Sequence, residues 1–392
     1  MVNQNCVLFD NLIWADMLPL TYTRPASELR VGVTTIKEKW QQYFNSVSDI
    51  TAAYLQEKYP ANIVADNYFI NSAVIPNNKL VEEILRLKNN QYLFKGDFLI
   101  AFRSPVFEAD VIKSNGVIAE YTGGLISIIT PWDIFEKNGQ VLLNDFDTLT
   151  KGRISQPISS TNRVLSPENI FIEPGAKVEF ATINASEGPV YIANGAEIME
   201  GALIRGPLAL CNHATIKMGA KIYGATTIGP HCKAAGEIHN SVLTGYSNKG
   251  HDGYLGNAVL GEWCNIGADS NNSNLKNNYE KVKMWSYRHE RFVDTGLQFC
   301  GLIMGDHSKC GINTMFNTGT VVGVSANIFG SGFPRNFVPS FSWGGAAGFT
   351  TYSLKKAVDT AKIVLERRKM QLAGTDLNIL EHVFKATEKY RR

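Results

Sequence analysis

Aliphatic side chains recur every six residues in the middle of the chain, at Ile192, Ile198, Ile204, Leu210, Ile216, Ile222 and Ile228. A small or short residue follows four positions after most of them (Ala196, Ala202, Ala214, Ala220, Thr226 and Cys232). An α-helix would scatter this repeat around its axis, because six residues make about 1.67 turns. A single long strand would instead bury every second residue. The repeat therefore predicts a parallel β-helix, in which each hexapeptide forms one short strand and one corner. An ordinary β-sandwich with chance spacing is the alternative.

The same spacing continues on both sides of this segment. Ile172 and Val178 keep it on the N-terminal side, and on the C-terminal side it returns at Leu260, Ile266, Met304, Cys310, Phe316, Val322 and Ile328. Two long excursions, at residues 245–255 and 271–296, interrupt the count. Loops that leave the corners of a stacked β-helix are a common place for functional residues. We therefore expect the site on these excursions.

The flanks of the repeat have other patterns. Strand and helix signals alternate over residues 1–158, which predicts an α/β domain with Rossmann-like layers. Residues 34–44 are expected to form one of its helices, with Ile36, Trp40 and Phe44 on one face. The predicted β-helix domain covers residues 159–342. After a Gly-rich stretch, residues 343–392 are expected to form a helical segment whose charged residues lie on a solvated face.

Composition narrows the class of protein. The net charge is only +2 at pH 7, which argues against a nucleic acid or an anionic membrane as the main partner. The sequence contains no apolar run that could span a bilayer and no N-terminal pattern of a secretory signal. Its six cysteines form no C-x-x-C pair, and no His/Cys cluster has the spacing of metal ligands. These observations predict a cytoplasmic protein without a structural metal.

Two motifs carry a resemblance to a known family. Residues 250–256 read Gly-His-Asp-Gly-Tyr-Leu-Gly, and a rung over residues 259–268 and then Asn274 follow. Residues 18–25 read Leu-Pro-Leu-Thr-Tyr-Thr-Arg-Pro. With these motifs the chain resembles a divergent branch of the sugar nucleotidyltransferase family with a left-handed β-helix. That family includes the bifunctional N-acetylglucosamine-1-phosphate uridyltransferase/glucosamine-1-phosphate acetyltransferases. The left hand of the β-helix is implied by this resemblance.

The resemblance also implies roles for individual residues. His251 falls at the position of the catalytic base, and Tyr254 and Asn265 at positions that bind the sugar. Ala268 and Asn274 fall where the family handles the acetyl group. A histidine suits general-base chemistry near neutral pH, and a backbone N–H or an amide can stabilise an oxyanion. Outside this motif, a lone histidine in a polar loop would be interpreted as a surface residue.

The N-terminal domain departs from the family pattern. The loop at residues 10–16 has no glycine and carries two acidic residues, where the family has a Gly-rich loop that cradles phosphates. Arg24 and Arg30 remain as candidate phosphate ligands. Asp97, in Lys-Gly-Asp, is either a metal ligand or part of a tight turn, and we favour the turn. The domain is therefore interpreted as a degenerate nucleotidyltransferase.

The sequence gives less information about which residues bind the acceptor substrate. Arg205, Lys249, Lys276 and Lys283 are candidates for binding an anionic acceptor or the phosphates of coenzyme A. The sequence favours acyl transfer from acetyl-CoA to an amino- or hydroxy-sugar phosphate, by a homotrimer. One alternative is nucleotidylyl transfer to a sugar 1-phosphate at the N-terminal domain, which would need Mg²⁺ and make a nucleotide sugar. The other is a non-catalytic ligand-binding protein.

Overall fold

A computed structural model describes residues 2–107 and 117–391. The chain divides into two compact units. The first consists of Met1–Met17, Arg24–Leu29 and Thr34–Thr130, and the second of Leu18–Thr23, Arg30–Val33 and Pro131–Arg392. The long C-terminal segment of the second unit thus begins at residue 131, whereas the sequence predicts the domain boundary after residue 158. The difference arises because helix α4 (Asp133–Thr150) packs on the β-helix, where its Asn138 side chain donates to the carbonyl oxygen of Ala225 at 2.8 Å.

The first unit is built on a six-stranded mixed sheet. Its strands, in spatial order, are β2 (Phe44–Ile50), β1 (Val2–Phe9), β3 (Asn67–Asn71), β6 (Phe98–Ser104), β5 (Gln91–Lys95) and β7 (Val117–Glu120). Strand β1 pairs in parallel with both β2 and β3, while β6 runs antiparallel to β3 and β5. A small antiparallel pair, β4 (Val74–Ile75) and β8 (Ile126–Ser127), lies outside this sheet. The buried rings of Phe9, Phe69 and Phe102 pack on the central strands.

Short helices connect these strands. They are α1 (Ile13–Asp16), η1 (Ala26–Glu28), α2 (Ile36–Trp40), η2 (Ala53–Leu55) and α3 (Asn78–Leu85). Helix α2 starts at a capping box made by Thr35 and Glu38. It ends at Trp40, so the expectation of one helix through Phe44 is wrong. Phe44 instead begins β2, where its buried ring packs against Trp40 and Tyr68.

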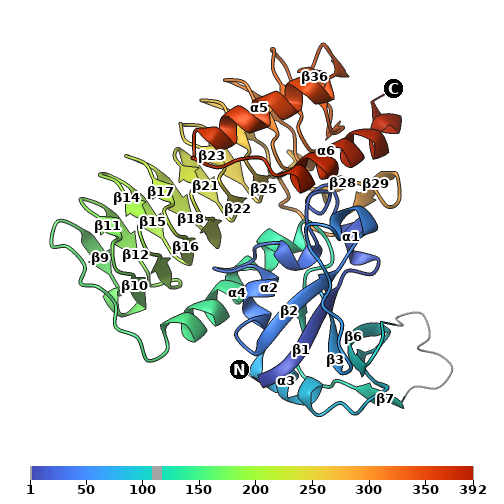
Figure 1. The fold of residues 1–392 in the computed structure, drawn as a ribbon. Coiled ribbons are helices and arrows are strands. Elements are labelled where there is room, and N and C mark those ends of the chain that lie inside the picture. The colour runs from blue at the N-terminus through green and yellow to red at the C-terminus, as the bar shows by residue number, and fades with distance from the viewer. Residues whose placement is uncertain (1, 108–116, 392) are drawn as a thin grey trace. The chain divides into compact units, whose positions relative to one another are not determined.

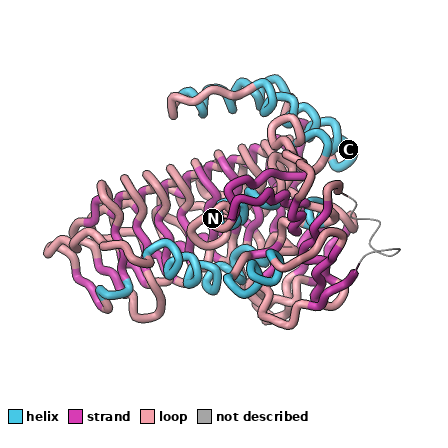
Figure 2. Tube along the Cα trace, turned by 60° about the horizontal axis from the view of Figure 1, so that its bottom comes forward, coloured by secondary structure: helices cyan, strands magenta, loops and turns pink. Residues whose placement is uncertain are grey.

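Three parallel sheets form the β-helix of the second unit, and Figure 2 shows their strands as stacked rows. One sheet contains β10 (Ile170–Ile172), β13 (Val190–Ile192), β16 (Leu208–Leu210), β19 (Thr226–Ile228), β22 (Val242–Gly245), β25 (Val259–Glu262), β30 (Leu302–Met304), β33 (Thr320–Val322) and β35 (Phe337–Val338). The second contains β11 (Lys177–Val178), β14 (Glu197–Ile198), β17 (Thr215–Ile216), β20 (Lys233–Ala234), β23 (Asn248–Lys249), β26 (Asn265–Ile266), β31 (Lys309–Cys310), β34 (Asn327–Ile328), β36 (Ser342–Gly345) and the antiparallel edge strand β37 (Gly348–Thr351). The third contains β24 (Tyr254–Gly256), β21 (Glu237–His239), β18 (Lys221–Tyr223), β15 (Leu203–Arg205), β12 (Thr182–Asn184) and β9 (Arg163–Leu165), and β27 (Asn271–Asn272) pairs separately with β32 (Met315–Phe316).

The six-residue repeat accounts for this architecture. Ile192 pairs with Leu210 and Leu210 with Ile228, each eighteen residues later, so three hexapeptides complete one coil. The repeating aliphatic side chains are buried in one continuous core. The predicted fold class is therefore confirmed, with an α/β domain followed by a left-handed parallel β-helix and C-terminal helices.

An insertion and two C-terminal helices complete the second unit. The insertion, residues 273–301, carries the antiparallel hairpin β28 (Lys283–Ser286) and β29 (Arg291–Asp294), and we call it the arm. Helix α5 (Leu354–Glu366) runs along the β-helix beside β23 and β36, and α6 (Gly374–Ala386) follows it (Figure 1). The short helix η3 (Pro167–Asn169) lies between β9 and β10, and η4 (Glu388–Tyr390) lies near the end of the described chain. Within the described residues, no helix is both long and apolar enough to cross a membrane.

Candidate functional site

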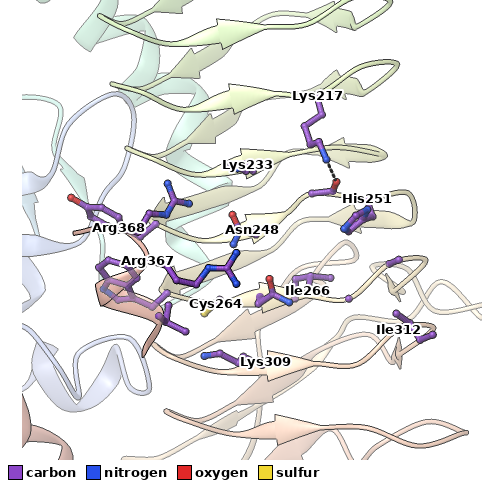
Figure 3. A pocket seen from close by; sticks show the side chains of 17 residues that line it. Lys217, Lys233, Asn248, His251, Cys264, Ile266, Lys309, Ile312, Arg367 and Arg368 are labelled. Atoms are coloured by element: carbon purple, nitrogen blue, oxygen red, sulfur yellow. Dashed lines mark hydrogen bonds between the residues drawn. The ribbon is translucent and has the colours of Figure 1, made fainter. Parts of the chain in front are cut away.

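A groove of about 830 Å³ lies on the face of the β-helix that contains β17, β20, β23, β26 and β31. The end of α5 forms its other wall, through Val364, Arg367 and Arg368 (Figure 3). We call this cavity the basic groove, because Lys217, Lys233, Lys309, Arg367 and Arg368 all line it. Of the residues that the structure describes, no aspartate or glutamate lines it. Five cations without an acidic neighbour on the wall favour a ligand with several negative charges.

Several of these cations are held in place by backbone carbonyl oxygens. The Nζ atom of Lys217 donates to Gly250 at 3.2 Å, and that of Lys309 donates to His307 at 3.0 Å. The Nη2 atom of Arg368 donates to His231 at 3.2 Å. Burial lowers the pKa of the Lys309 amine from its usual value. These contacts fix the cations while leaving part of their donor capacity for a ligand.

Stacked rings form the corner of the β-helix beside the groove. His213, His231, Tyr246, Trp263 and His307 follow one another up the corner, with centroid separations of 5.1, 4.8, 4.3 and 6.4 Å. Tyr246 and Trp263 also line the groove. Burial, followed by the neighbouring charge of His213, lowers the pKa of His231. The stack gives the groove a rigid aromatic edge.

Three predicted site residues meet in the basic groove. His251 lies on the exposed loop between β23 and β24, Asn265 lies on β26, and Ala268 follows that strand. The groove is floored here by Gly267, whose added Cβ would come within 2.3 Å of the carbonyl oxygen of Gly311. Only a glycine allows the two neighbouring coils to approach this closely. The structure thus brings His251, Asn265 and Ala268 together as lining residues of a single cavity.

Tyr254 and Asn274 form a separate pair. The Asn274 Nδ2 atom donates to the Tyr254 hydroxyl at 3.0 Å and to Asn257 Oδ1 at 2.8 Å. Burial raises the pKa of Tyr254, although the Asn274 contact opposes this. Neither residue of the pair lines the basic groove. The two halves of the predicted constellation therefore lie at neighbouring places on one chain rather than in one cavity.

Lys249 is not a surface ligand, which corrects the expectation from the sequence. Its side chain is fully buried, because it takes the inward position six residues after Leu243. There its Nζ atom donates to the carbonyl oxygens of Asp252 at 2.8 Å, Ala235 at 3.4 Å and His251. Burial lowers the pKa of this amine to about 8. Lys249 thus anchors the loop that carries His251 from inside the β-helix.

Five other predicted ligands also lie away from the groove. Arg205 is exposed and pairs with Glu187 at 3.1 Å, and Lys276 and Lys283 line a different cavity. Arg30 is buried in the second unit, where its Nε atom donates to Thr244 at 3.2 Å and its Nη1 atom donates to Val33. Arg30 is therefore a structural tie and not an exposed phosphate ligand. Arg24 is buried in the first unit, where its charge opposes the burial that raises the pKa of Glu28.

The loop after β1 has a structural explanation. The Asp10 carboxylate is buried and accepts from the Ala26 backbone N–H at 3.0 Å, from Ser72 Oγ at 2.8 Å and from the Thr51 hydroxyl. Burial raises its pKa to about 6. Asp10 therefore ties three segments together. This role agrees with the sequence, in which the acidic loop departs from the phosphate-binding pattern.

The segment around Asp97 is a turn. Gly96 has a φ of +56° between β5 and β6, and its N–H donates to Glu120 at 2.9 Å. This geometry supports the turn interpretation over a metal ligand. Over residues 2–107 and 117–391, no group of three His, Cys, Asp or Glu side chains is placed to hold a metal ion.

Comparison with known proteins supports the resemblance. Residues 6–154 match the family described as sugar nucleotidyl transferase. The chain is 28% identical over 261 residues to the bifunctional sugar-1-phosphate nucleotidylyltransferase/acetyltransferase of Sulfurisphaera tokodaii, covering 65% of this chain and 58% of that protein. It is 31% identical over 281 residues to the bifunctional protein GlmU of Methanocaldococcus jannaschii, covering 69% of this chain and 57% of that protein.

The chain is thus similar to sugar nucleotidyl transferases over residues 6–154 and to bifunctional nucleotidylyltransferase/acetyltransferases over about two thirds of its length. It spans a little over half the length of these two curated relatives. Among solved structures, it is similar to the polySia specific acetyltransferase NeuO, with 13% identity, a TM-score of 0.27 and coverage of 48% of this chain and 79% of that one. A second is an Arabidopsis UDP-N-acetylglucosamine acyltransferase, with 16% identity, a TM-score of 0.23 and coverage of 54% and 80%.

Most of the residues that line the basic groove are not among those predicted from the sequence. Lys233 and Lys309 each precede an inward residue, Ala234 or Cys310, so the repeat itself places them on the outer face of their sheet. The outward position of these two lysines could therefore be predicted from the six-residue repeat. Arg367 and Arg368 had been assigned to a solvated helix face, and no local pattern places the end of α5 over β23 and β26.

Proposed function

We propose that the protein transfers an acyl group from acetyl-CoA to an amino- or hydroxy-sugar phosphate, with His251 as the general base. The observation that carries this proposal is that His251, Asn265 and Ala268 share one groove with five cations. Coenzyme A is a long, flexible molecule with several phosphate charges, and the basic groove crosses five neighbouring strands and is lined by five cations. The acceptor phosphate adds a further negative charge for the same surface.

The proposed chemistry assigns a step to each of these residues. His251 accepts the proton from the acceptor N–H or O–H as that atom bonds to the acetyl carbon. The backbone N–H of Ala268 donates to the oxyanion that develops on the former carbonyl oxygen. The carbon–sulfur bond then breaks, and the thiolate takes a proton to give the free thiol. In this scheme Asn265 orients the acceptor.

The pair Tyr254–Asn274 suggests that the complete site needs a second copy. It lies outside the basic groove, and apolar Ile312 at the groove wall is 71% exposed. We propose a homotrimer in which the β-helix of a neighbour covers this wall, so that the two groups of residues face one acceptor. Light scattering of the full chain at micromolar concentration tests this, and a clean monomer would contradict it.

Release of free thiol tests the acyl transfer. The full chain is incubated with acetyl-CoA and a panel of amino- and hydroxy-sugar phosphates, and thiol is measured with a chromogenic disulfide. We expect release with at least one acceptor and its loss in His251→Ala. His289→Ala is the matched control, since His289 is also exposed but lies on the turn of the arm. Binding of coenzyme A without any thiol release would favour the non-catalytic alternative.

The family match over residues 6–154 favours a second candidate activity. In it the N-terminal domain joins a nucleoside triphosphate to a sugar 1-phosphate and releases pyrophosphate, with Mg²⁺. The described residues show no preformed cluster of metal ligands, so a metal would have to be brought with the nucleotide. Pyrophosphate release that is lost in Arg24→Ala would establish this activity independently of the thiol assay.

A further inference from the structure

A second cavity, of about 750 Å³, lies under the arm of the β-helix unit. It shares no lining residue with the basic groove. Its walls come from the arm, from the segment around β35 and from η4 at the end of the described chain. We call it the arm pocket.

Three cations line the arm pocket. Lys276 and Lys283 come from the arm, and Arg335 comes from the segment before β35. Lys276 has a loose ion pair with Glu280 at 3.8 Å. Among the described residues, neither Lys283 nor Arg335 has an ion pair, and no acidic residue lines the pocket. The charges of Lys283 and Arg335 are therefore available to an anion.

Three aromatic rings face the same cavity: Phe292, Phe337 and Tyr390. Phe292 is 43% exposed, so part of its ring is open to a ligand. Behind these rings lies Trp285, stacked on Phe337 at 4.3 Å with an interplanar angle of 11° and edge-on to Phe292 at 5.5 Å. Tyr390 stands edge-on to Phe337 at 5.7 Å. The rings are thus fixed by packing and present a firm apolar surface to the cavity.

Polar groups complete the lining. The Asn336 side chain donates from Nδ2 to the carbonyl oxygen of Thr318 at 2.8 Å, which orients its Oδ1 atom as an acceptor. Both residues line the pocket. An oriented amide oxygen beside aromatic surface suits the edge of a heterocycle, which carries N–H donors. The pocket therefore combines a surface for a flat ring with donors for several negative charges.

We propose that the arm pocket binds a nucleoside diphosphate, either free or as the head of a nucleotide sugar. The base lies against Phe292, Phe337 and Tyr390, and the diphosphate contacts Lys283 and Arg335. Stacking of a base on an aromatic side chain and charge-assisted contacts to phosphate are both favourable, and the volume lies within the usual range of ligand sites. An ordinary sugar phosphate would leave the rings uncovered, and a nucleoside would leave the cations unpaired.

Calorimetric titration of the full chain tests the proposal with UDP and ADP as probes. Uridine is the matched ligand without the phosphate charges, and inorganic pyrophosphate is the matched ligand without the base. We expect saturable binding of at least one diphosphate, and binding at least tenfold weaker for uridine and for pyrophosphate. Coenzyme A is titrated separately, since it also contains an adenosine diphosphate unit. Its binding is expected to depend on Lys309 in the basic groove instead.

Variants locate the site. Lys283→Gln and Arg335→Gln, made separately, are each expected to weaken diphosphate binding about tenfold. Arg291→Gln is the control, because Arg291 is an exposed cation of the same hairpin that does not line the pocket. Both tested cations are exposed, so the variants should fold, and a circular dichroism melt checks this. Absence of saturable diphosphate binding, or binding lost in Arg24→Ala or Lys309→Gln but unchanged in both pocket variants, would overturn the proposal.

Discussion

The Nζ atom of Lys249 donates a hydrogen bond of 2.8 Å to the carbonyl oxygen of Asp252 from inside the β-helix. It also donates to the carbonyl oxygen of His251. The position of the candidate base is therefore tied to the core of the protein and not to the surface of a loose loop. An inward lysine is costly in a core of aliphatic side chains, and here burial lowers the pKa of its amine to about 8.

Replacement of this lysine tests whether it positions His251. In Lys249→Met, the loop carbonyls lose their partner while the side-chain volume stays similar, so the loop is free to shift. We expect the turnover number for thiol release to fall about tenfold to a hundredfold with little change in KM for acetyl-CoA. The free energy of unfolding in urea should fall by about 1–2 kcal/mol. Lys281→Met, at an exposed position of the arm, should leave both quantities unchanged.

The inward position of Lys249 could also be predicted from the sequence. Leu243, Lys249 and Leu255 are six residues apart, so the rule that predicts the inward isoleucines predicts an inward lysine as well. Treating residues 245–255 as an excursion from the count predicts instead that Lys249 contacts the substrate. The structure shows that the coil continues through this segment, with Ala234 paired to Lys249.

Other features depend on contacts distant in sequence. A six-residue count determines which face of each strand is buried, so the β-helix and its core could be predicted from local pattern alone. Nothing in residues 364–368 indicates which coils α5 covers, and the groove wall that it forms was missed for that reason. Helix α4 depends on such contacts as well, because its Ile134, Val141 and Leu142 side chains are buried once the helix packs on the β-helix.

The buried carboxyl of Asp10 predicts a pH dependence of stability in the first unit. Its folded pKa of about 6 exceeds its ordinary value of 3.8, because burial disfavours the charge. The folded state therefore binds more protons than the unfolded state between about pH 4 and 6, and the free energy of unfolding falls as pH rises through this window. Asp10→Asn removes the titration but retains the accepting oxygen for Ala26 and Ser72.

Paired unfolding curves measure this effect. Relative to the unchanged protein, Asp10→Asn should gain stability steadily from about pH 4 to 6 and then stay level. Asp97→Asn, which removes a carboxylate from an exposed turn of the same unit, is the control. An Asp10→Asn curve that runs parallel to the original across the whole window would show that the carboxyl is not destabilised by burial.

The cations of the basic groove predict how the donor binds. Lys309→Gln and Arg367→Gln should each weaken coenzyme A binding about tenfold and reduce its salt dependence. If these cations contact the 3′-phosphate, the preference for coenzyme A over dephospho-coenzyme A should shrink in the same variants. Lys362→Gln is the matched control, because Lys362 is an exposed lysine of α5 that does not line the groove. Equal binding by all three variants in calorimetry would remove the groove as the donor site.

Gly267 and Gly311 give a paired test of the coil spacing beside His251. A Cβ at Gly267 would lie 2.3 Å from the carbonyl carbon and oxygen of Gly311, so the two coils would have to separate. A Cβ at Gly311 would meet the Phe329 Cβ at 3.6 Å, the Ile328 carbonyl oxygen at 3.7 Å and the Phe329 Cα at 3.8 Å, which are ordinary van der Waals contacts. Gly267→Ala should therefore lower the free energy of unfolding by about 1–3 kcal/mol and reduce thiol release, since Gly267 lines the groove. Gly311→Ala should change the free energy of unfolding by no more than about 0.5 kcal/mol and the rate of thiol release by no more than about twofold. Equal losses in both variants would show that the distance between these coils does not determine the geometry at His251.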